Sequence, residues 1–538
     1  MNSLWLILVS IIIFGIAYVT YGSWLAKQWG VDPTRKTPAH TKNDGVDYVP
    51  AKAPVLLGHH FASIAGAGPI VGPIAAAVFG WVPVMLWILI GGIFFGGVQD
   101  FGSLFASIRH DGRSIGEIIE ANMGRNMKRL FSIFAWLTLL LVVAAFVNIV
   151  ANTFVSVPAA ASASVLFIIL AVLFGFFVYR KGAPIGIASV IGVILLFLCI
   201  VLGNMFPLVL SKNAWIAILL GYIFIASVTP VWILLQPRDY LNSFLLYAML
   251  IGAVLGLVFY RPTIQLPAFT GFTASNGLKL FPMLFVVVAC GAISGFHSLV
   301  GSGTTSKQMD SEADAKAVGY GGMLIECVLA VIAIITAAYI TKDKFAELAG
   351  AGGPVNVFSD GIGVFMSKFG IPYEIGKSFV ALAVSAFALT SLDTGTRLGR
   401  FIFQEMFENP EKEKQSFLTN RFVATGITVV LGGWLALGSW TAIWPIFGSA
   451  NQLLAALALI TIAVWLKNSG KKYIMFAIPM TFMFIVTITA LWQLLQANLA
   501  KGNNILVFFA VFLLVLAIVL AVSGIKVLRS SSRPKIKA

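Results

Sequence analysis

Runs of about 20 apolar residues recur along the whole chain, and this feature limits its fold more than any other. A run of that length is what an α-helix needs to cross roughly 30 Å of hydrocarbon. Of the 538 residues, 59% are hydrophobic and only 11% are charged, whereas a soluble domain carries about 25% charged residues. Because the chain cannot cover its apolar mass in water, we predict an all-α polytopic membrane protein.

About fifteen membrane-spanning helices account for the apolar runs. We place them at 3–22, 55–79, 82–108, 129–153, 160–180, 184–206, 214–236, 240–259, 280–303, 317–340, 376–396, 420–437, 440–466, 472–494 and 505–527. If alternate loops lie on opposite sides, 28 of the 36 Lys and Arg residues fall on one side and 8 on the other. Basic residues concentrate in cytoplasmic loops, so we expect a cell-membrane protein with its N-terminus outside and its C-terminus in the cytoplasm.

The composition excludes other classes of protein. The net charge is +15, but the basic residues are scattered between spans and do not form the clustered face of a nucleic-acid-binding protein. Cys199, Cys290 and Cys327 all lie in apolar runs, which disfavours a disulfide framework. The first apolar run lacks a basic region before it and a cleavage site after it, so we interpret it as a retained helix. The expected partners are the lipid bilayer and a small molecule, with no nucleic acid.

The second span is interrupted between Gly58 and Pro73, where glycines, two prolines and the pair His59 and His60 occur together. Each proline removes a helix hydrogen bond, which leaves carbonyl groups free to face a substrate or an ion. The alternative is a close-packed helix of small residues. The two histidines favour a functional site, because ionisable residues are costly within a membrane.

The ninth span contains a similar segment. Residues 296–303 match residues 61–68 at Phe, Ser and two Gly positions. Seven spans separate the two segments, so they cross the membrane in opposite directions. Paired, interrupted helices of opposite topology are typical of secondary transporters built from inverted repeats, with the site near the bilayer midplane. We divide the chain into an N-terminal helix and loop (1–52), a first repeat with extra helices (53–279), a second repeat (280–470) and C-terminal helices with a basic tail (471–538).

Polar side chains within other spans are candidates for binding a coupling ion. Asp100 lies near the inner end of the third span, Glu326 lies deep in the tenth, and Thr390, Ser391 and Asp393 end the eleventh. A carboxylate in hydrocarbon costs several kcal/mol, so these groups are expected to face protein or water. The two hydroxyls either bond their own helix or offer oxygen ligands to sodium.

Three further interpretations concern charged residues. Asp393 either serves in coupling or forms an ion pair with Arg397, one helical turn later. Arg238 and Asp239 follow Pro237 at the inner face, where they form either a rigid turn or an intracellular gate. The loop 341–375 is Gly-rich and expected outside, whereas 397–419 is highly charged and expected inside.

Metal and enzyme chemistry are disfavoured. His59, His60 and His297 are the candidates for a metal site, but adjacent histidines on a helix point about 100° apart and rarely share one ion. The sequence has no zinc-hydrolase motif, nucleophile elbow or phosphate-binding loop. We therefore predict neither an enzyme nor a resident metal.

Several strings together resemble the carbon starvation protein family. They are residues 58–70, 236–241, 294–298 with Gln308, 390–394 and 448–455, and the resemblance extends over nearly the whole chain from about residue 50. The first two strings are the most specific. The family is similar to the amino-acid–polyamine–cation superfamily of secondary carriers, and its members are associated with uptake of peptides and with proton-coupled uptake of pyruvate during carbon limitation.

The resemblance implies a leucine-transporter-type inverted repeat with broken helices. The second and ninth spans are then the two discontinuous helices, and the eleventh supplies the Thr390–Ser391 pair that holds a coupling sodium. Spans seven and eight are then extra helices between two five-helix repeats. A seven-plus-seven inverted repeat fits the number of spans equally well.

We therefore expect a secondary active transporter for a small carboxylate such as pyruvate or for short peptides, driven by a proton or sodium ion and needing no other cofactor. Broken-helix N-termini around 63–68 and 301–303 would offer amide groups to a carboxylate, and histidines would carry protons. The alternatives are a channel and a membrane sensor of starvation. The predicted substrate-binding residues are His59, His60, Ser63, Gly66, Gly68, Phe296, His297, Ser298, Gly301 and Gly303.

Overall fold

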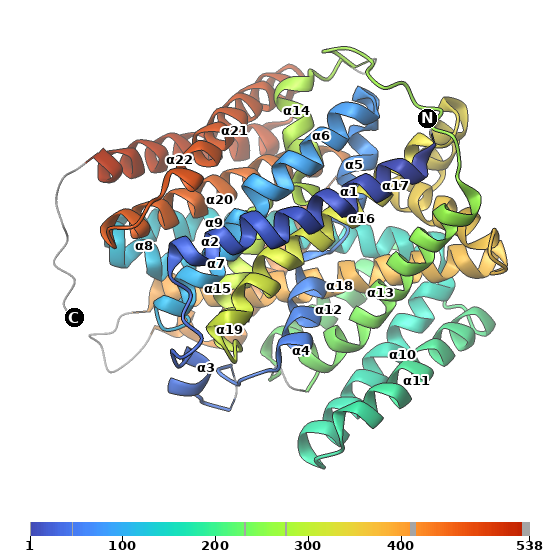
Figure 1. The fold of residues 1–538 in the computed structure, drawn as a ribbon, viewed down its shortest axis with the longest axis horizontal. Helices are drawn as coiled ribbons and strands as arrows, with labels where there is room; N and C mark the ends of the chain where they lie inside the picture. Colours follow the sequence, from blue (N-terminus) through green and yellow to red (C-terminus); the bar gives the residue numbers. More distant parts are fainter. Residues whose placement is uncertain are drawn as a thin grey trace.

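The computed structural model describes residues 2–45, 47–230, 233–274, 277–408, 416–438 and 440–529, which form a bundle of helices (Figure 1). Within these residues, 12 helices are long and apolar enough to cross a membrane, and one bent pair raises the number to 13. Two shorter apolar helices, α12 (Lys212–Val228) and α19 (Arg421–Ala436), complete the set. Each corresponds to one predicted span, so the expectation of about fifteen is confirmed.

The unbroken spans are continuous helices, some of which contain a π-helical turn. They are α1 (Ser3–Ala17) with η1 (Tyr18–Gly22) and α2 (Ser23–Trp29), α6 (Trp81–Gly91) with η3 (Gly92–Gly96) and α7 (Gly97–Arg109), α9 (Arg125–Ser156), α10 (Pro158–Gly175) with η4 (Phe176–Arg180), α11 (Ile185–Met205), α13 (Leu235–Tyr260), η8 (Lys316–Gly321) with α16 (Gly322–Ala338), α18 (Tyr373–Phe407), α20 (Trp440–Asn468), α21 (Ile474–Ala500) and α22 (Asn504–Arg529).

The second predicted span is broken, as the sequence indicates. Helix α4 (Ala53–Ile64) ends before residues 65–67, and α5 (Gly68–Ala75) continues directly into η2 (Ala76–Phe79). The segment Gly68–Phe79 is bent by 43° from α4. Pro69 lies in the first turn of α5, where no helix hydrogen bond is lost. The break therefore comes directly before the first proline.

The ninth span is also broken, but the position predicted for its second half is wrong. Helix α14 (Leu280–Val288) and η5 (Ala289–Gly291) precede the break, and α15 (Gly295–Gly303) follows it. Residues 301–303 therefore end this half-helix, whereas the sequence suggested that they begin it. Gly303 serves helix packing, because a Cβ there would lie 2.6 Å from Leu398 Cδ2.

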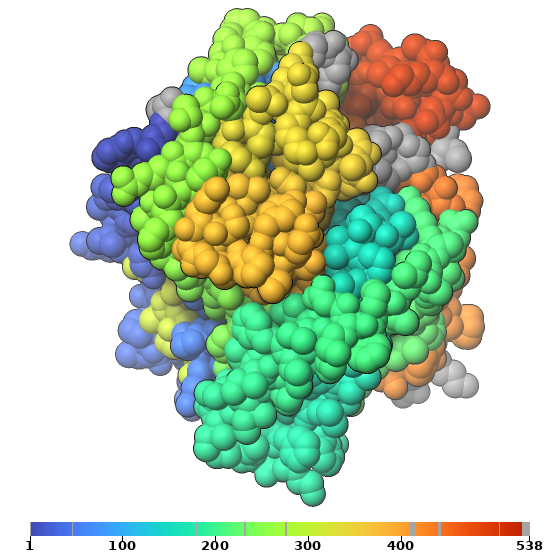
Figure 2. Space-filling model, turned by 90° about the vertical axis from the view of Figure 1, so that its right-hand side faces the viewer, coloured from blue at the N-terminus to red at the C-terminus, as the bar shows by residue number. Residues whose placement is uncertain are grey.

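The helix pair α10–α11 lies at the edge of the bundle, with α10 packed on α13 and α18. Figure 2 shows the green α10–α11 pair projecting at one edge of the molecule. Only 22% of the most apolar window of α11 is buried in the protein. By contrast, α12 packs on α9, α18 and α19, and α13 packs on α4, α17 and α18. Spans seven and eight are therefore packed within the bundle.

Another correction concerns the predicted loop 341–375. Most of it forms α17 (Lys342–Ser367), which is kinked at Gly352 and at Gly353, whose φ is +72°. The half of α17 after this kink is largely buried against α13 and α18. The glycines that suggested a loop permit the kink, because glycine adopts positive φ without a steric penalty. In the charged segment 397–419, residues 409–415 lie outside the described residues, as does the tail from residue 530.

Contacts between loops show which loops lie at the same end of the bundle. The N-terminal segment lies beside the loop after α13, through the bridge between Asn2 and Thr263. The loop after α2, which includes α3 (Pro38–Thr41), lies beside the segment after α15, through the bridges of Lys36 with Ser311 and of Ala51 with Met309. Figure 1 shows α3 and α8 (Ile115–Met123) at the end of the bundle away from the N-terminus.

Candidate functional site

A cluster of buried ionisable side chains lies where α15 begins after its break. The Nδ1 group of His297 donates to Oδ2 of Asp100 in α7 at 2.8 Å, and its Nε2 lies 3.4 Å from Oε2 of Glu326 in α16. The side chains of all three are fully buried. Neither oxygen of Glu326 accepts a hydrogen bond within the described residues. The sequence proposed Asp100 and Glu326 for the coupling ion and His297 for substrate binding or proton transfer, and the structure brings the three together.

The break before α15 is held by side-chain amides. Gln99 in α7 donates from Nε2 to the carbonyl oxygen of Ser294 at 2.5 Å and to Oδ1 of Asp100 at 3.1 Å. Oδ1 of Asn451 in α20 accepts from the backbone amide of Phe296 at 2.9 Å. Gln452 donates to the carbonyl of Ile293 at 3.1 Å. These contacts satisfy backbone groups that a continuous helix would pair internally.

His59 and His60 contact different neighbours. His59 Nδ1 donates to Oδ2 of Asp239 at 3.1 Å, whereas His60 Nδ1 lies 2.8 Å from Oγ1 of Thr305. Both rings are almost fully buried, and the Nε2 atom of each has no hydrogen-bond partner in the described part of the chain. The two adjacent histidines therefore belong to two separate groups of polar side chains.

The second group is a buried ion-pair network centred on Arg238. Its guanidinium contacts Asp393 and Tyr222 through Nη1, and Asp239 Oδ1 at 3.1 Å and Thr390 Oγ1 at 3.2 Å through Nη2. Tyr222 also donates to Oδ2 of Asp393 at 2.7 Å. Four helices, α4, α12, α13 and α18, are thus tied together by hydrogen bonds to buried charges.

For each of these two charged sites, the structure excludes one of the two alternatives that the sequence left open. Arg238 and Asp239 do not form a turn, because they lie in the first turns of α13, where Pro237 is tolerated. Asp393 pairs with Arg238 and not with Arg397, whose Nη2 donates to the carbonyls of Ala226 and Thr229. Those carbonyls end α12, so Arg397 caps a helix and has no ion-pair role with Asp393.

The hydroxyls of Thr390 and Ser391 point to different surroundings. Ser391 donates to the carbonyl oxygen of Ser63, next to the break between α4 and α5, at 3.2 Å. Thr390 accepts from Arg238 and from Asn242 at 3.3 Å. One residue of the pair therefore faces the broken helix, and the other faces a fixed positive charge.

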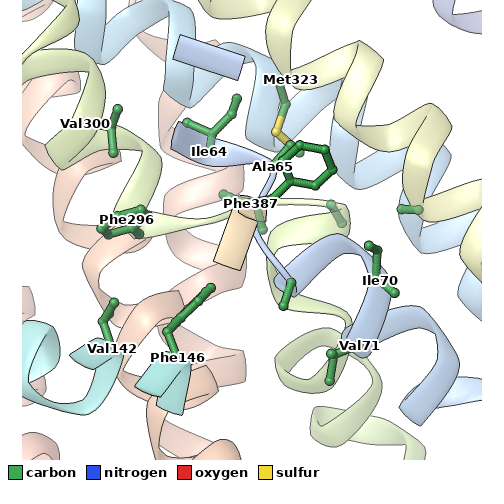
Figure 3. Packing of buried hydrophobic residues seen from close by; sticks show 14 of the residues in the cluster. Ile64, Ala65, Ile70, Val71, Val142, Phe146, Phe296, Val300, Met323 and Phe387 are labelled. Carbon is green, nitrogen blue, oxygen red and sulfur yellow. The ribbon is translucent and has the colours of Figure 1, made fainter. Parts of the chain in front are cut away.

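The glycines of the first break are closely packed. A Cβ on Gly66 would overlap Oγ of Ser391 and lie 2.9 Å from Phe146, and one on Gly68 would lie 2.7 Å from Sγ of Cys290. Figure 3 shows buried apolar side chains around both breaks, among them Ile64, Ala65, Phe296 and Phe387.

Of the other predicted residues, Ser63 Oγ has no hydrogen-bond partner in the described chain, and Ser298 Oγ donates to Gly295 O at 2.6 Å. A Cβ added to Gly301 would lie 3.8 Å from Cβ of Leu104.

A small cavity opens on the side of the bundle that carries α3. It has a volume of about 10 Å³, which is room for about one water molecule. Its lining comprises Asp47, His59, Leu235, Gln236, Gly303, Thr304, Lys307, Gln308, Arg397 and Phe401. A hydrogen bond of 2.7 Å from Nε2 of Gln236 to Oε1 of Gln308 joins α13 to the segment after α15.

The sequence interpretation missed three residues of these networks. Asn242 lies four residues after Arg238, so helical periodicity could have placed it on the same face. Tyr222 and Thr305 gave no signal, because a tyrosine within an apolar helix and a threonine after one are both common. Within the described residues, no group of three or more His, Cys, Asp or Glu side chains is arranged to hold a metal ion.

Solved structures share this fold at low sequence identity. A crystal structure of the manganese transporter of Eremococcus coleocola superposes with a TM-score of 0.51 at 13% identity, covering 90% of this chain and 99% of that one. At this identity the likeness concerns the fold alone. The all-helical fold with two broken spans agrees with the expected leucine-transporter-type architecture.

Sequence relatives are much closer. The peptide transporter CstA of Escherichia coli (strain K12) is 35% identical over 91% of this chain and 81% of its own length, and the pyruvate/proton symporter BtsT of the same strain is 33% identical over 93% and 81%. The peptide transporter CstA of Bacillus subtilis (strain 168) is 32% identical over 98% and 97%. These relatives are transporters and not enzymes. The family described as Carbon starvation protein CstA matches residues 2–352 and 346–490, and the chain therefore belongs to this family of membrane transporters.

Proposed function

We propose that this protein is a proton-driven symporter of the cell membrane that takes up a small carboxylate such as pyruvate, or short peptides. The observation that carries the proposal is the position of His297 between Asp100 and Glu326, without exposed surface, at the start of a broken half-helix. Relatives named as a pyruvate/proton symporter and as peptide transporters support it. The fold supports a distant relation to the amino-acid–polyamine–cation superfamily.

The physical chemistry of this cluster favours a proton site. Burying an unpaired charge is strongly unfavourable. The two buried carboxyl groups and the imidazole therefore cannot each be charged without a partner of opposite charge. The three side chains therefore share protons and change charge as a unit. Asp100 is also bonded to Gln99, which holds the carbonyl of Ser294 in the break. A proton gained or lost here would thus act on the hinge of the broken span.

The surroundings of Thr390 weigh against sodium. A coupling sodium at Thr390 and Ser391 would need oxygen ligands from both hydroxyls, but Thr390 accepts from Arg238. A guanidinium carries a permanent positive charge and would repel a second cation beside it. A proton site at the His297 cluster does not meet this repulsion.

Pyruvate and peptides share a carboxylate, and the breaks provide groups that suit it. A helix N-terminus attracts an anion through its free amides and its dipole. Such groups lie at Gly68, where α5 starts, and at Phe296, His297 and Ser298, where α15 starts. In this conformation the backbone amide of Phe296 donates to the side chain of Asn451. The substrate carboxylate would replace Asn451 as the acceptor. The excess of basic residues supports an outside N-terminus and a cytoplasmic C-terminus.

The test is uptake into proteoliposomes under separate proton and sodium gradients, with labelled pyruvate in one arm and a labelled dipeptide in the other. We expect accumulation of one of them with the proton gradient alone. Glu326→Gln and Asp100→Asn should abolish driven accumulation and retain exchange of internal for external substrate. Gln496→Ala, at an exposed position of α21, is the matched control.

Three outcomes would contradict the proposal. Accumulation driven only by sodium would place the coupling ion elsewhere. Binding of pyruvate or the dipeptide without accumulation under any gradient would indicate a sensor. Full proton-driven accumulation by both carboxyl variants would remove the His297 cluster from coupling.

A further inference from the structure

We infer that His59, held by Asp239, releases the coupling proton into the small cavity on the side of α3, and that His60 passes the proton to it from the central cluster. This inference rests on the proposed proton coupling. It assigns an exit path for the proton, whereas the proposed function assigns only the site that binds it.

The first observation is the geometry of the His59 ring. Asp239 accepts from Nδ1 at 3.1 Å, so a neutral ring carries its hydrogen on Nδ1 and a free electron pair on Nε2. Nε2 has no hydrogen-bond partner in the described residues. The side chain is 4% exposed and that of Asp239 is 0% exposed. The buried carboxylate of Asp239 holds the ring in place through Nδ1 and leaves Nε2 free.

The second observation is the cavity beside this ring. His59 lines it together with Gln236, Lys307 and Gln308. It has room for about one water molecule, which could take a proton from Nε2. A histidine kept only for packing would have no need of such a space. The Gln236–Gln308 hydrogen bond closes the cavity between α13 and the segment after α15.

The third observation connects His59 to the central cluster. A Cβ on Gly322 would lie 3.4 Å from Cδ2 of His60, so the ring of His60 lies against α16 at this residue. Glu326 is four residues further along the same helix and therefore lies on the same face, one turn away. His60 Nε2 also has no partner among the described residues. Of the two histidines, His60 is therefore the one that packs against the helix carrying Glu326.

The charged and titratable groups around His59 come from every element packed on α4. They are Arg238 and Asp239 of α13, Asp393 and Arg397 of α18, His297 of α15, Lys307 after α15, Glu326 of α16, Asp47 of the loop after α3, His60 of α4 itself, and Lys316 of η8, which donates to Ser23. Asp239 is the one that contacts the ring directly. Its negative charge offsets the positive charge that His59 gains.

The transfer is balanced at each atom. Glu326 and His60 Nε2 are not hydrogen-bonded to each other in this structure, so the transfer requires a movement of α4 against α16. After that movement Glu326 gives its proton to Nε2 of His60, which becomes an imidazolium while Glu326 becomes a carboxylate. His60 then gives a proton to Nε2 of His59, while the hydrogen on Nδ1 of His59 stays on that nitrogen and remains hydrogen-bonded to Asp239. His59 finally loses the Nε2 proton to water in the cavity. Both rings return to the neutral state, and one proton has moved to the α3 side.

The experiment compares His59→Asn with the intact protein in the proteoliposome assay. Asparagine retains a donor toward Asp239 and has no basic nitrogen. We expect at least a tenfold loss of proton-driven uptake, because a positioned proton carrier contributes about 10² or more to a rate. Exchange under equal proton concentration should be retained. His110→Gln, at a half-buried histidine that follows the last residue of α7, is the matched control and should keep full uptake.

Chemical rescue gives a second readout that a structural role would not produce. In His59→Ala, added imidazole should restore uptake by entering the space of the lost ring. Pyrazole, which has the same size and is a far weaker base, should not. Imidazole added to the intact protein controls for loss of the proton gradient.

The outcomes separate this inference from the proposed function. If the intact protein shows no proton-driven uptake, the proposed function itself fails. If it does, but His59→Asn retains full driven uptake with an unchanged pH profile, the exit path is wrong and the coupling site stands. Equal rescue by imidazole and pyrazole would show that His59 only fills space.

Discussion

Gln99 of α7 donates to the carbonyl oxygen of Ser294 at 2.5 Å and so holds the break of the second discontinuous span. The same amide nitrogen lies 3.1 Å from Oδ1 of Asp100, whose other oxygen accepts from His297. One side chain therefore connects the hinge of a broken helix with the charged cluster beside it. This connection gives a physical route from protonation to a change of conformation.

Replacing Gln99 by Leu should destabilise the protein by about 1–3 kcal/mol, because the carbonyl of Ser294 is then buried without a hydrogen bond. The check is thermal unfolding of the purified protein in detergent. Gln496→Ala, at an exposed residue, should leave the Tm unchanged. An unaltered Tm in Gln99→Leu would show that the bond contributes nothing to the hinge.

Asn451→Ala should cost about 0.5–2 kcal/mol of stability, as expected for the loss of a helix cap. Asn451 Oδ1 accepts from the amide of Phe296 at 2.9 Å. In the uptake assay the same change should lower the KM for a carboxylate substrate, because the amide no longer has an internal partner. A raised KM would contradict a carboxylate at this position.

Arg238→Gln should be among the most destabilising single changes, at about 3–5 kcal/mol, because it leaves the buried carboxylates of Asp393 and Asp239 without their partner. The double change Arg238→Gln with Asp393→Asn should be less harmful than the sum of the two single changes, since both charges are removed. Urea or thermal unfolding of the four proteins measures this coupling. Additive effects would show that the ion pair carries no net interaction.

Gly66→Ala should destabilise by about 1–3 kcal/mol, because the added methyl group overlaps Ser391 and Phe146. Ser391→Ala in the same chain should recover part of the loss by removing the hydroxyl. The matched control is Gly221→Ala in α12, where no atom lies within 4 Å of the new methyl group. Equal Tm values for the two alanine variants would contradict close packing at the break.

The sequence predicted which segments cross the membrane, because that depends on composition over about 20 residues. It also predicted both broken spans, since proline and glycine act locally on the backbone. It misplaced the second break because glycines that permit close helix packing look the same in sequence as glycines that end a helix. Gly303 packs on Leu398, whereas the chain turns at residues 292–294.

Pairing between distant side chains could not be derived in the same way. Asp393 has Arg397 one turn away in the sequence, yet it pairs with Arg238, which is 155 residues distant. His297, Asp100 and Glu326 belong to three helices. Nothing in a single segment encodes which face of one helix meets which face of another.

The amino-acid sequence by itself determined that the chain is a helical membrane protein, where its spans lie and which two of them are broken, because hydrophobic length and backbone restriction are local properties. Only the tertiary structure decided which buried charges meet, since that depends on how side chains from separate helices fill the interior. The cost of burying an unpaired charge then selects the pairs that the fold keeps.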